Sequence, residues 1–273
     1  MSLLAANTRF AFRILVVALA AVLIGEGCGK VSSRSVSLLG STSIQPFAEV
    51  LAEQYTKKNS GNFVEVQGGG STAGLQAVAN GLADIGMCSR ELTAEETRQF
   101  TRILVARDGL AIVVNAGNRV ARLSIEEIRA LFAGRLTNWR EVGGQDGPIR
   151  PITREEGSGT RESFVRLVMG KERISRRALT QESNGAVKEL VKGDPAAIGY
   201  MSLGLVGKEI GAVAVEGAQP TTANVLAGRY TLVRPLLFVT KGAASPAAQS
   251  FVDFVLSPEG QRLLEKEGLV RAR

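Results

Sequence analysis

The chain alternates short apolar runs with segments whose apolar residues recur at helical spacing. The runs typical of strands lie at residues 36–40, 62–67, 83–89, 110–115, 148–154, 197–203 and 230–241. Helical patterns between them begin at Ser43, at Ser71 or Thr72, and at Ser124, Ser158, Ser183, Ser245 and Ser257. Because strands alternate with helices, we predict an α/β fold with mostly parallel sheets. The continuous apolar run LAIVVN at 110–115 is typical of a buried parallel strand.

The helix boundaries are marked by capping residues. Ser124 and Glu127 form a capping box, and Gly134 closes that helix. Ser43 is expected to cap a helix that has Pro46 in its first turn. These local signals fix where the helices begin, but they do not show how the strands pair.

Three turns that lead from a strand into a helix share one composition. They are GSTS at 40–43, GGGSTAG at 68–74 and EEGSGTR at 155–161. A helix N-terminus presents unpaired N–H groups and partial positive charge, glycine lets the backbone close around a ligand, and Ser or Thr adds a hydroxyl donor. A single turn of this kind is an ordinary cap. Three of them in one α/β chain favour an anion site where strand ends meet helix starts.

Arg154 precedes the third turn and adds a planar guanidinium, which can hold two oxygen atoms at once. The alternative is a surface ion pair with Glu155 or Glu156, which would contribute little to stability. In the ligand-binding interpretation, one glutamate orients the guanidinium and offsets its charge.

The first 27 residues have the pattern of a signal peptide. Arg9 and Arg13 precede an apolar run at 14–25, which is too short to span a bilayer as a helix. Cys28 follows directly and is similar to the lipidated cysteine of bacterial lipoproteins, although Glu26 departs from the usual motif. Ordinary secretion therefore remains the alternative. We expect an exported protein, in the periplasm or at the outer face of the cytoplasmic membrane, anchored through Cys28 if that residue is acylated.

Composition narrows the function classes. The chain has 273 residues, of which 45% are apolar and 22% charged, as in a globular protein of one or two domains. Its net charge of +7 is dispersed and aromatic residues make up only 5%, which argues against nucleic acid binding. The chain has no histidine, so Ser158 lacks the usual general base. We therefore expect no enzyme activity, no metal and no cofactor. Cys88 is expected to be a small buried residue.

Six segments together carry a resemblance to a known family. They are GSTSIQPFAE, VEVQGGGSTAGLQAVANGLADIGMCSRELT, LSIEEIRALFAGRLTNWREVGG, TREEGSGTRESF, AAIGYMSLG and SPEGQRLLEKEGLV. In this order they resemble the short form of the phosphate-binding proteins of ABC phosphate importers. The resemblance implies a two-lobed type II periplasmic binding-protein fold with the ligand cleft between the lobes. It places lobe I at 35–113 plus 225–273 and lobe II at 114–224.

The resemblance also implies which residues hold the ligand. The ligand residues it implies are Thr42, Ser43, Ser71, Ser89, Arg90, Arg154, Ser158, Gly159 and Thr160, with Thr72, Glu155 and Glu156 beside them. Longer members have an aspartate where this chain has Ser89, and that aspartate accepts the proton of phosphate. Here the acceptor stays open between Glu155, Glu156, a backbone carbonyl and a serine oxygen. Arg90 has an alternative role in a surface pair with Glu91.

The function implied is capture of inorganic phosphate by a monomer and its delivery to an ABC permease with an associated ATPase. Because the proton acceptor is unassigned, a binding protein for sulfate, molybdate or another oxyanion is the main alternative. A sensing or adhesion role on the same fold is a further one.

Overall fold

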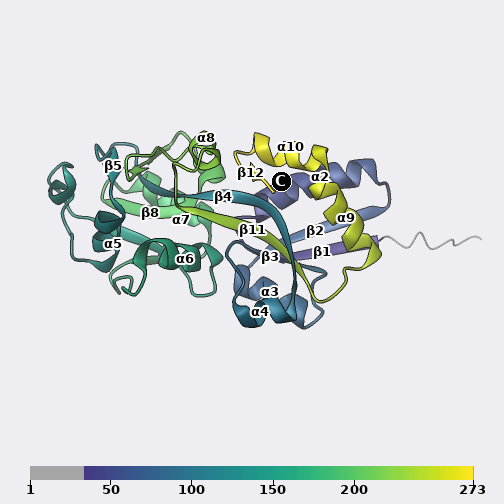
Figure 1. Ribbon diagram of the computed structural model, residues 1–273. Helices are drawn as coiled ribbons and strands as arrows, with labels where there is room; N and C mark the ends of the chain where they lie inside the picture. Colours follow the sequence, from purple (N-terminus) through teal and green to yellow (C-terminus); the bar gives the residue numbers. More distant parts are fainter. Residues whose placement is uncertain (1–33, 273) are drawn as a thin grey trace, which may run out of the picture. The chain divides into compact units, whose positions relative to one another are not determined.

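Two long strands, β4 (Thr101–Asn115) and β11 (Val233–Thr240), run antiparallel to each other through both halves of the molecule (Figure 1). The computed structural model describes residues 34–272. The predictions for the signal peptide and for Cys28 lie outside these residues.

A mixed sheet joins the two halves, with strand order β2-β1-β3-β11-β4-β8-β6-β7. In the first half, β1 (Arg34–Gly40) pairs in parallel with β2 (Asn62–Gly68) and β3 (Ile85–Cys88). In the second half, β6 (Arg150–Arg154) pairs in parallel with β7 (Leu179–Gln181) and β8 (Ala197–Ser202). Smaller strands are β5 (Arg122–Leu123), β9 (Ile210–Ala212), β10 (Ala214–Val215) and β12 (Val270–Arg271).

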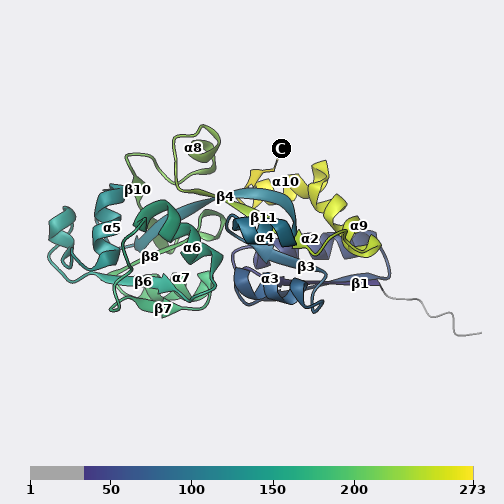
Figure 2. The same cartoon turned by 60° about the horizontal axis from the view of Figure 1, so that its bottom comes forward.

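The helices fall into the same two groups (Figure 2). The first half has α2 (Gln45–Lys58), α3 (Ser71–Ala79), α4 (Ala94–Gln99), α9 (Pro246–Leu256) and α10 (Pro258–Lys266). The second half has α5 (Ile125–Ala133), α6 (Gly159–Phe164), α7 (Asn184–Gly193) and α8 (Thr222–Leu226). Short turns of other helix types are Trp139–Val142, Val165–Met169 and Leu203–Leu205. No helix of the described part is long and apolar enough to span a membrane.

The two largest apolar cores lie in different halves, and β4 contributes to both. Val105 and Ala106 pack in the core formed by β1, β3, α2 and α9, whereas Leu110 and Ile112 pack in the core formed by α5, α6 and β8. We call these halves lobe I and lobe II. Val225, Tyr230 and Leu232 contribute to the core of lobe II, although the resemblance assigned positions from 225 onward to lobe I. The exact division of the chain stays a prediction.

Two local expectations were wrong. LAIVVN is buried, but within β4 it pairs antiparallel with β8 and β9, because this strand crosses between the lobes instead of entering through a βαβ unit. Ser43 does not cap α2: the N-cap is Ile44, with no side-chain cap bond. The capping box at Ser124, the cap at Ser158 and the helix start at Ser183 are confirmed.

Candidate functional site

The hydroxyl-rich turns predicted from the sequence meet at one place between the lobes. Thr42 and Ser43 follow β1, Ser71 opens α3 after β2, and Ser89 follows β3. From lobe II, Arg154 ends β6 and Ser158 caps α6. All of these lie at the C-terminal ends of parallel strands, which is where open α/β sheets bind ligands.

Arg154 is a buried cation of this cluster. Its side chain is only 1% exposed, and Glu155 holds it through two bonds of 2.8 Å, from Nε and from Nη2. The same guanidinium donates to the carbonyls of Gln181 and Glu182, and Nη2 donates to Thr42 Oγ1 at 3.2 Å across the lobes. Within residues 34–272, Nη1 of Arg154 is buried and has no hydrogen-bond partner. A buried donor of a charged group needs an acceptor, so Nη1 is the atom of this guanidinium that stays available to an oxygen atom of a ligand.

A second contact between the lobes joins Ser43 to Thr160. Their hydroxyl oxygen atoms lie 2.8 Å apart, and both side chains are almost fully buried. Ser43 Oγ also accepts from Asn184 Nδ2 at 2.9 Å. Asn184 opens α7, so three loops converge on this pair of hydroxyls.

Ser71 and Ser89 form a third group, within lobe I. The backbone N–H of Ser89 donates to Ser71 Oγ at 3.1 Å, and the two hydroxyl oxygens are 3.4 Å apart. Ser41 donates to Ser89 Oγ at 2.8 Å. Gly159 of lobe II lies against both serines: a Cβ at this position would be 2.2 Å from Ser71 Oγ and 2.8 Å from Ser89 Oγ. Hydroxyls of lobe I therefore face the backbone at the start of α6.

The remaining predicted residues lie at the edges of this cluster. Ser158 is buried and accepts from Arg161 N–H as the cap of α6. Thr72 is partly buried, and its N–H donates to the carbonyl of Gly157 at 3.1 Å. Glu156 is exposed, so Glu155 is the glutamate that holds Arg154.

Arg90 is buried, but its guanidinium is occupied by two carboxylates. It forms a bidentate pair with Glu96 at 2.7 and 2.8 Å, and its Nε lies 2.7 Å from Glu162 of lobe II. The hydrogen bond from Arg90 holds the pKa of Glu96 below its ordinary value. The side chain of Glu91 pairs instead with Arg102. Contact between Arg90 and a ligand stays a prediction, while the structure gives Arg90 a clear role in joining the lobes.

Sequence reasoning did not select Asp108 or Arg234, which form a fully buried ion pair next to the cluster. Arg234 donates to the hydroxyls of both Ser43 and Thr160. Burial raises the pKa of Asp108 and lowers that of Arg234, and the attraction between the two groups opposes both shifts. The available signal was Arg234 inside the apolar run of β11 and Asp108 two residues before the apolar run 110–115 of β4, and only strand pairing makes these two residues neighbours.

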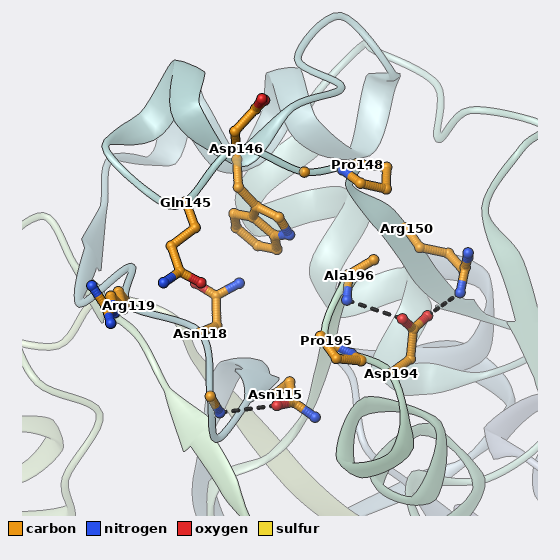
Figure 3. A pocket seen from close by; sticks show the side chains of 13 residues that line it. Asn115, Asn118, Arg119, Gln145, Asp146, Pro148, Arg150, Asp194, Pro195 and Ala196 are labelled. Carbon is orange, nitrogen blue, oxygen red and sulfur yellow. Dashed lines mark hydrogen bonds and ion pairs between the residues drawn. The ribbon is translucent and has the colours of Figure 1, made fainter.

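The cavity drawn in Figure 3 lies elsewhere. It has a volume of about 440 Å³, and its wall includes Arg150, Asp194 and Trp139. Asp194 is held there by Arg150 and by the backbone N–H of Ala196 (Figure 3). Arg150 begins β6 and Arg154 ends it. The cavity at Arg150 and the cluster around Arg154 are therefore separated by the length of that strand, about 13 Å at the usual rise per residue of a β-strand.

The fold and the cluster define a two-lobed solute-binding protein. The model of the PBP superfamily domain matches residues 30–259. Phosphate-binding protein PstS of Bacillus subtilis is 31% identical over 236 residues, covering 85% of this chain and 78% of the relative. The chain therefore belongs to the PBP superfamily, in the family of the phosphate-binding proteins PstS.

Solved structures show the same relationship. A candidate phosphate ABC transporter substrate-binding protein of Clostridium perfringens, solved with bound phosphate, superposes with a TM-score of 0.85 at 37% identity, covering 88% of this chain and all of that one. An ABC-type phosphate transport receptor of Vibrio cholerae has a TM-score of 0.73 at 38% identity, covering 86% of this chain and 99% of that one. Members of this family bind a substrate for transport.

Proposed function

We propose that this protein captures inorganic phosphate between its lobes and delivers it to the permease of an ABC transporter with an associated ATPase. The family and the phosphate-bound relative support the ligand. The cluster of buried hydrogen-bond donors between the lobes supports the location of the binding site. The residues proposed to form the phosphate-binding site are Thr42, Ser43, Ser71, Ser89, Arg90, Arg154, Ser158, Gly159 and Thr160.

The observation that carries the proposal is the buried Nη1 atom of Arg154 without a partner within the described chain. Glu155 occupies Nε and Nη2, which leaves Nη1 for an external acceptor. An anion oxygen satisfies this donor, and the bidentate partner Glu155 keeps the guanidinium from turning away.

The available donors are sufficient for tight binding. A hydrogen bond to a charged group contributes about 1.5–3 kcal/mol. Micromolar affinity corresponds to about −8 kcal/mol, so about half a dozen contacts offset the costs of desolvation and of ordering the loops. Because the loops already contact each other through Ser43 and Thr160, much of the site is preformed.

Three further features belong to this proposal. The protein is exported and acts outside the cytoplasm as a monomer, with Cys28 as its acylated N-terminus; mass spectrometry of the mature protein tests the lipid. It performs no catalysis, and a chromogenic phosphate ester tests this, since turnover above a denatured control would contradict it. No metal or cofactor takes part in binding.

Titration calorimetry tests the ligand and the site together. Mature protein freed of bound phosphate by unfolding and refolding is titrated with phosphate and, separately, with sulfate and molybdate. We expect phosphate to bind most tightly, and Arg154→Ala to weaken it at least tenfold without unfolding the protein. The control is Arg166→Ala, an exposed arginine of the same lobe. Tighter binding of sulfate or molybdate would assign the protein to another oxyanion, and unchanged affinity in Arg154→Ala would remove the proposed site.

A further inference from the structure

A fully buried ion pair lies where the two long strands cross between the lobes. Arg234 of β11 stands opposite Asp108 of β4 in the antiparallel ladder. Both side chains are 0% exposed, and Nε and Nη2 of Arg234 donate to Asp108 Oδ2 at 3.1 and 2.9 Å. Asp108 lies on β4 between Ala106, which packs in the core of lobe I, and Leu110, which packs in the core of lobe II.

Stability alone does not account for such a pair. Withdrawing two charges from water offsets most of their attraction, and apolar residues of similar volume often stabilise a protein as well or better. The remaining donors of Arg234 indicate another role. Nη1 donates to Thr160 Oγ1 at 2.7 Å and Nη2 to Ser43 Oγ at 3.0 Å. One guanidinium thus holds a hydroxyl from each lobe.

These contacts fix the direction of two hydroxyl protons. Ser43 Oγ accepts from Arg234 and from Nδ2 of Asn184, neither of which is able to accept in return. The amide of Asn184 is oriented because its Oδ1 accepts from Ser202 N–H at 3.1 Å. With both lone pairs engaged, Ser43 donates its own hydrogen to Thr160 Oγ1, 2.8 Å away, so the Ser43 hydroxyl contributes to the phosphate site through Thr160.

Thr160 is then the end of the chain of hydrogen bonds. Its Oγ1 accepts from Arg234 and from Ser43, so its remaining capacity is as a donor. Among residues 34–272 no acceptor of the Thr160 hydrogen is present, so this hydrogen is available to an acceptor of a ligand. An oxygen atom of a bound anion that faces Thr160 must therefore accept a hydrogen bond and has no lone pair of Thr160 to which it can donate one.

We propose that Arg234, held in place by Asp108, is a positioning residue that fixes Thr160 as a hydrogen-bond donor to the bound phosphate and links the hydroxyls of the two lobes; this rests on the proposed function. The ion pair is neutral as a whole, so it acts by orienting donors and not by attracting the anion. The proton of phosphate then faces another part of the site, away from Thr160.

A double-mutant cycle tests this role. Arg234→Gln, Thr160→Val and the double variant are titrated with inorganic phosphate by calorimetry. We expect each single change to weaken binding about tenfold or more, and the double variant to bind about as weakly as the weaker single one, because Arg234 acts through Thr160. The control is Arg107→Gln, an exposed arginine adjacent to Asp108, which should bind as wild type. Additive losses, or wild-type affinity in Arg234→Gln, would overturn the proposal.

Two further variants guard against misfolding. Asp108→Asn with Arg234→Gln leaves no unpaired charge in the core and serves as the background if Arg234→Gln does not fold; wild-type affinity in that background also overturns the proposal. Arg234→Lys keeps the positive charge beside Asp108 but lacks the planar guanidinium that bonds Ser43 and Thr160 together. This variant should therefore recover only part of the phosphate affinity that Arg234→Gln loses. If wild-type protein fails to bind phosphate, the proposed function itself fails. If wild type binds and Arg154→Ala does not, while Arg234→Gln binds normally, only the role of Arg234 is refuted.

Discussion

Gly159 is the position where a single methyl group tests the contact between the lobes most directly. It begins α6 in lobe II, and an added Cβ would lie 2.2 Å from Ser71 Oγ and 2.8 Å from Ser89 Oγ in lobe I. Real Cβ atoms do not come this close to an oxygen, so Gly159→Ala forces Ser71 to rotate or the lobes to move apart. If Ser71 rotates, it loses the hydrogen bond from the N–H of Ser89.

The size of the effect follows from the cost of overpacking. An extra methyl group in a well-packed interior costs about 1–3 kcal/mol. Because the clash arises between lobes, this cost falls on the closed, ligand-binding arrangement more than on the separate lobes. A loss of about 1–3 kcal/mol corresponds to a roughly 5- to 150-fold increase in the Kd for phosphate.

Calorimetry with inorganic phosphate measures this increase, and thermal unfolding without phosphate shows whether the variant is folded. The matched control is Gly193→Ala at the end of α7, where an added Cβ meets no atom within 4 Å. We expect the control to keep wild-type affinity and to be equally or slightly more stable. Wild-type phosphate affinity in Gly159→Ala would show that the serines and the start of α6 do not meet around the ligand, which would refute the reasoning.

Two other outcomes are expected. Tyr200→Phe removes the hydroxyl that bonds Thr153 at 2.7 Å and accepts from the N–H of Arg154 at 3.2 Å, but it keeps the ring stacked on Phe164. We expect the free energy of unfolding, measured by urea denaturation, to fall by about 1–3 kcal/mol, because the N–H of Arg154 is left buried without this partner. An unchanged urea midpoint would contradict this. The hydrogen bond from Arg90 lowers the pKa of Glu96 below its ordinary 4.5, so the pair stabilises the fold above that pH and the benefit disappears as pH falls through the lowered value. Wild type should therefore melt higher than Glu96→Gln at pH 7, and this difference should shrink as the pH is lowered below 4.5; a difference that stays constant down to acid pH would count against the ion pair.

Much of the secondary structure could be predicted from the local sequence, because the hydrogen bonds that start a helix join residues only a few positions apart. Helix starts at Ser124, Ser158 and Ser183 follow from side chains that bond an N–H three residues later. The order of elements and the three hydroxyl-rich turns, together with the resemblance, were enough to predict the fold class and the family. They also predicted Glu155 or Glu156 as the partner of Arg154, without choosing between them.

Only the tertiary structure decided which charges and hydroxyls meet. Arg234 lies 191 residues from Ser43 and 126 from Asp108, and no local pattern relates positions so far apart. Ser43 looked like a helix cap, yet its hydroxyl is taken by Thr160, Asn184 and Arg234 once the lobes are packed. LAIVVN looked like a parallel strand because burial on both faces gives the same apolar run in either direction. Burial is recorded in the sequence of each element, whereas strand direction and hydrogen-bond partners are properties of how distant elements pack.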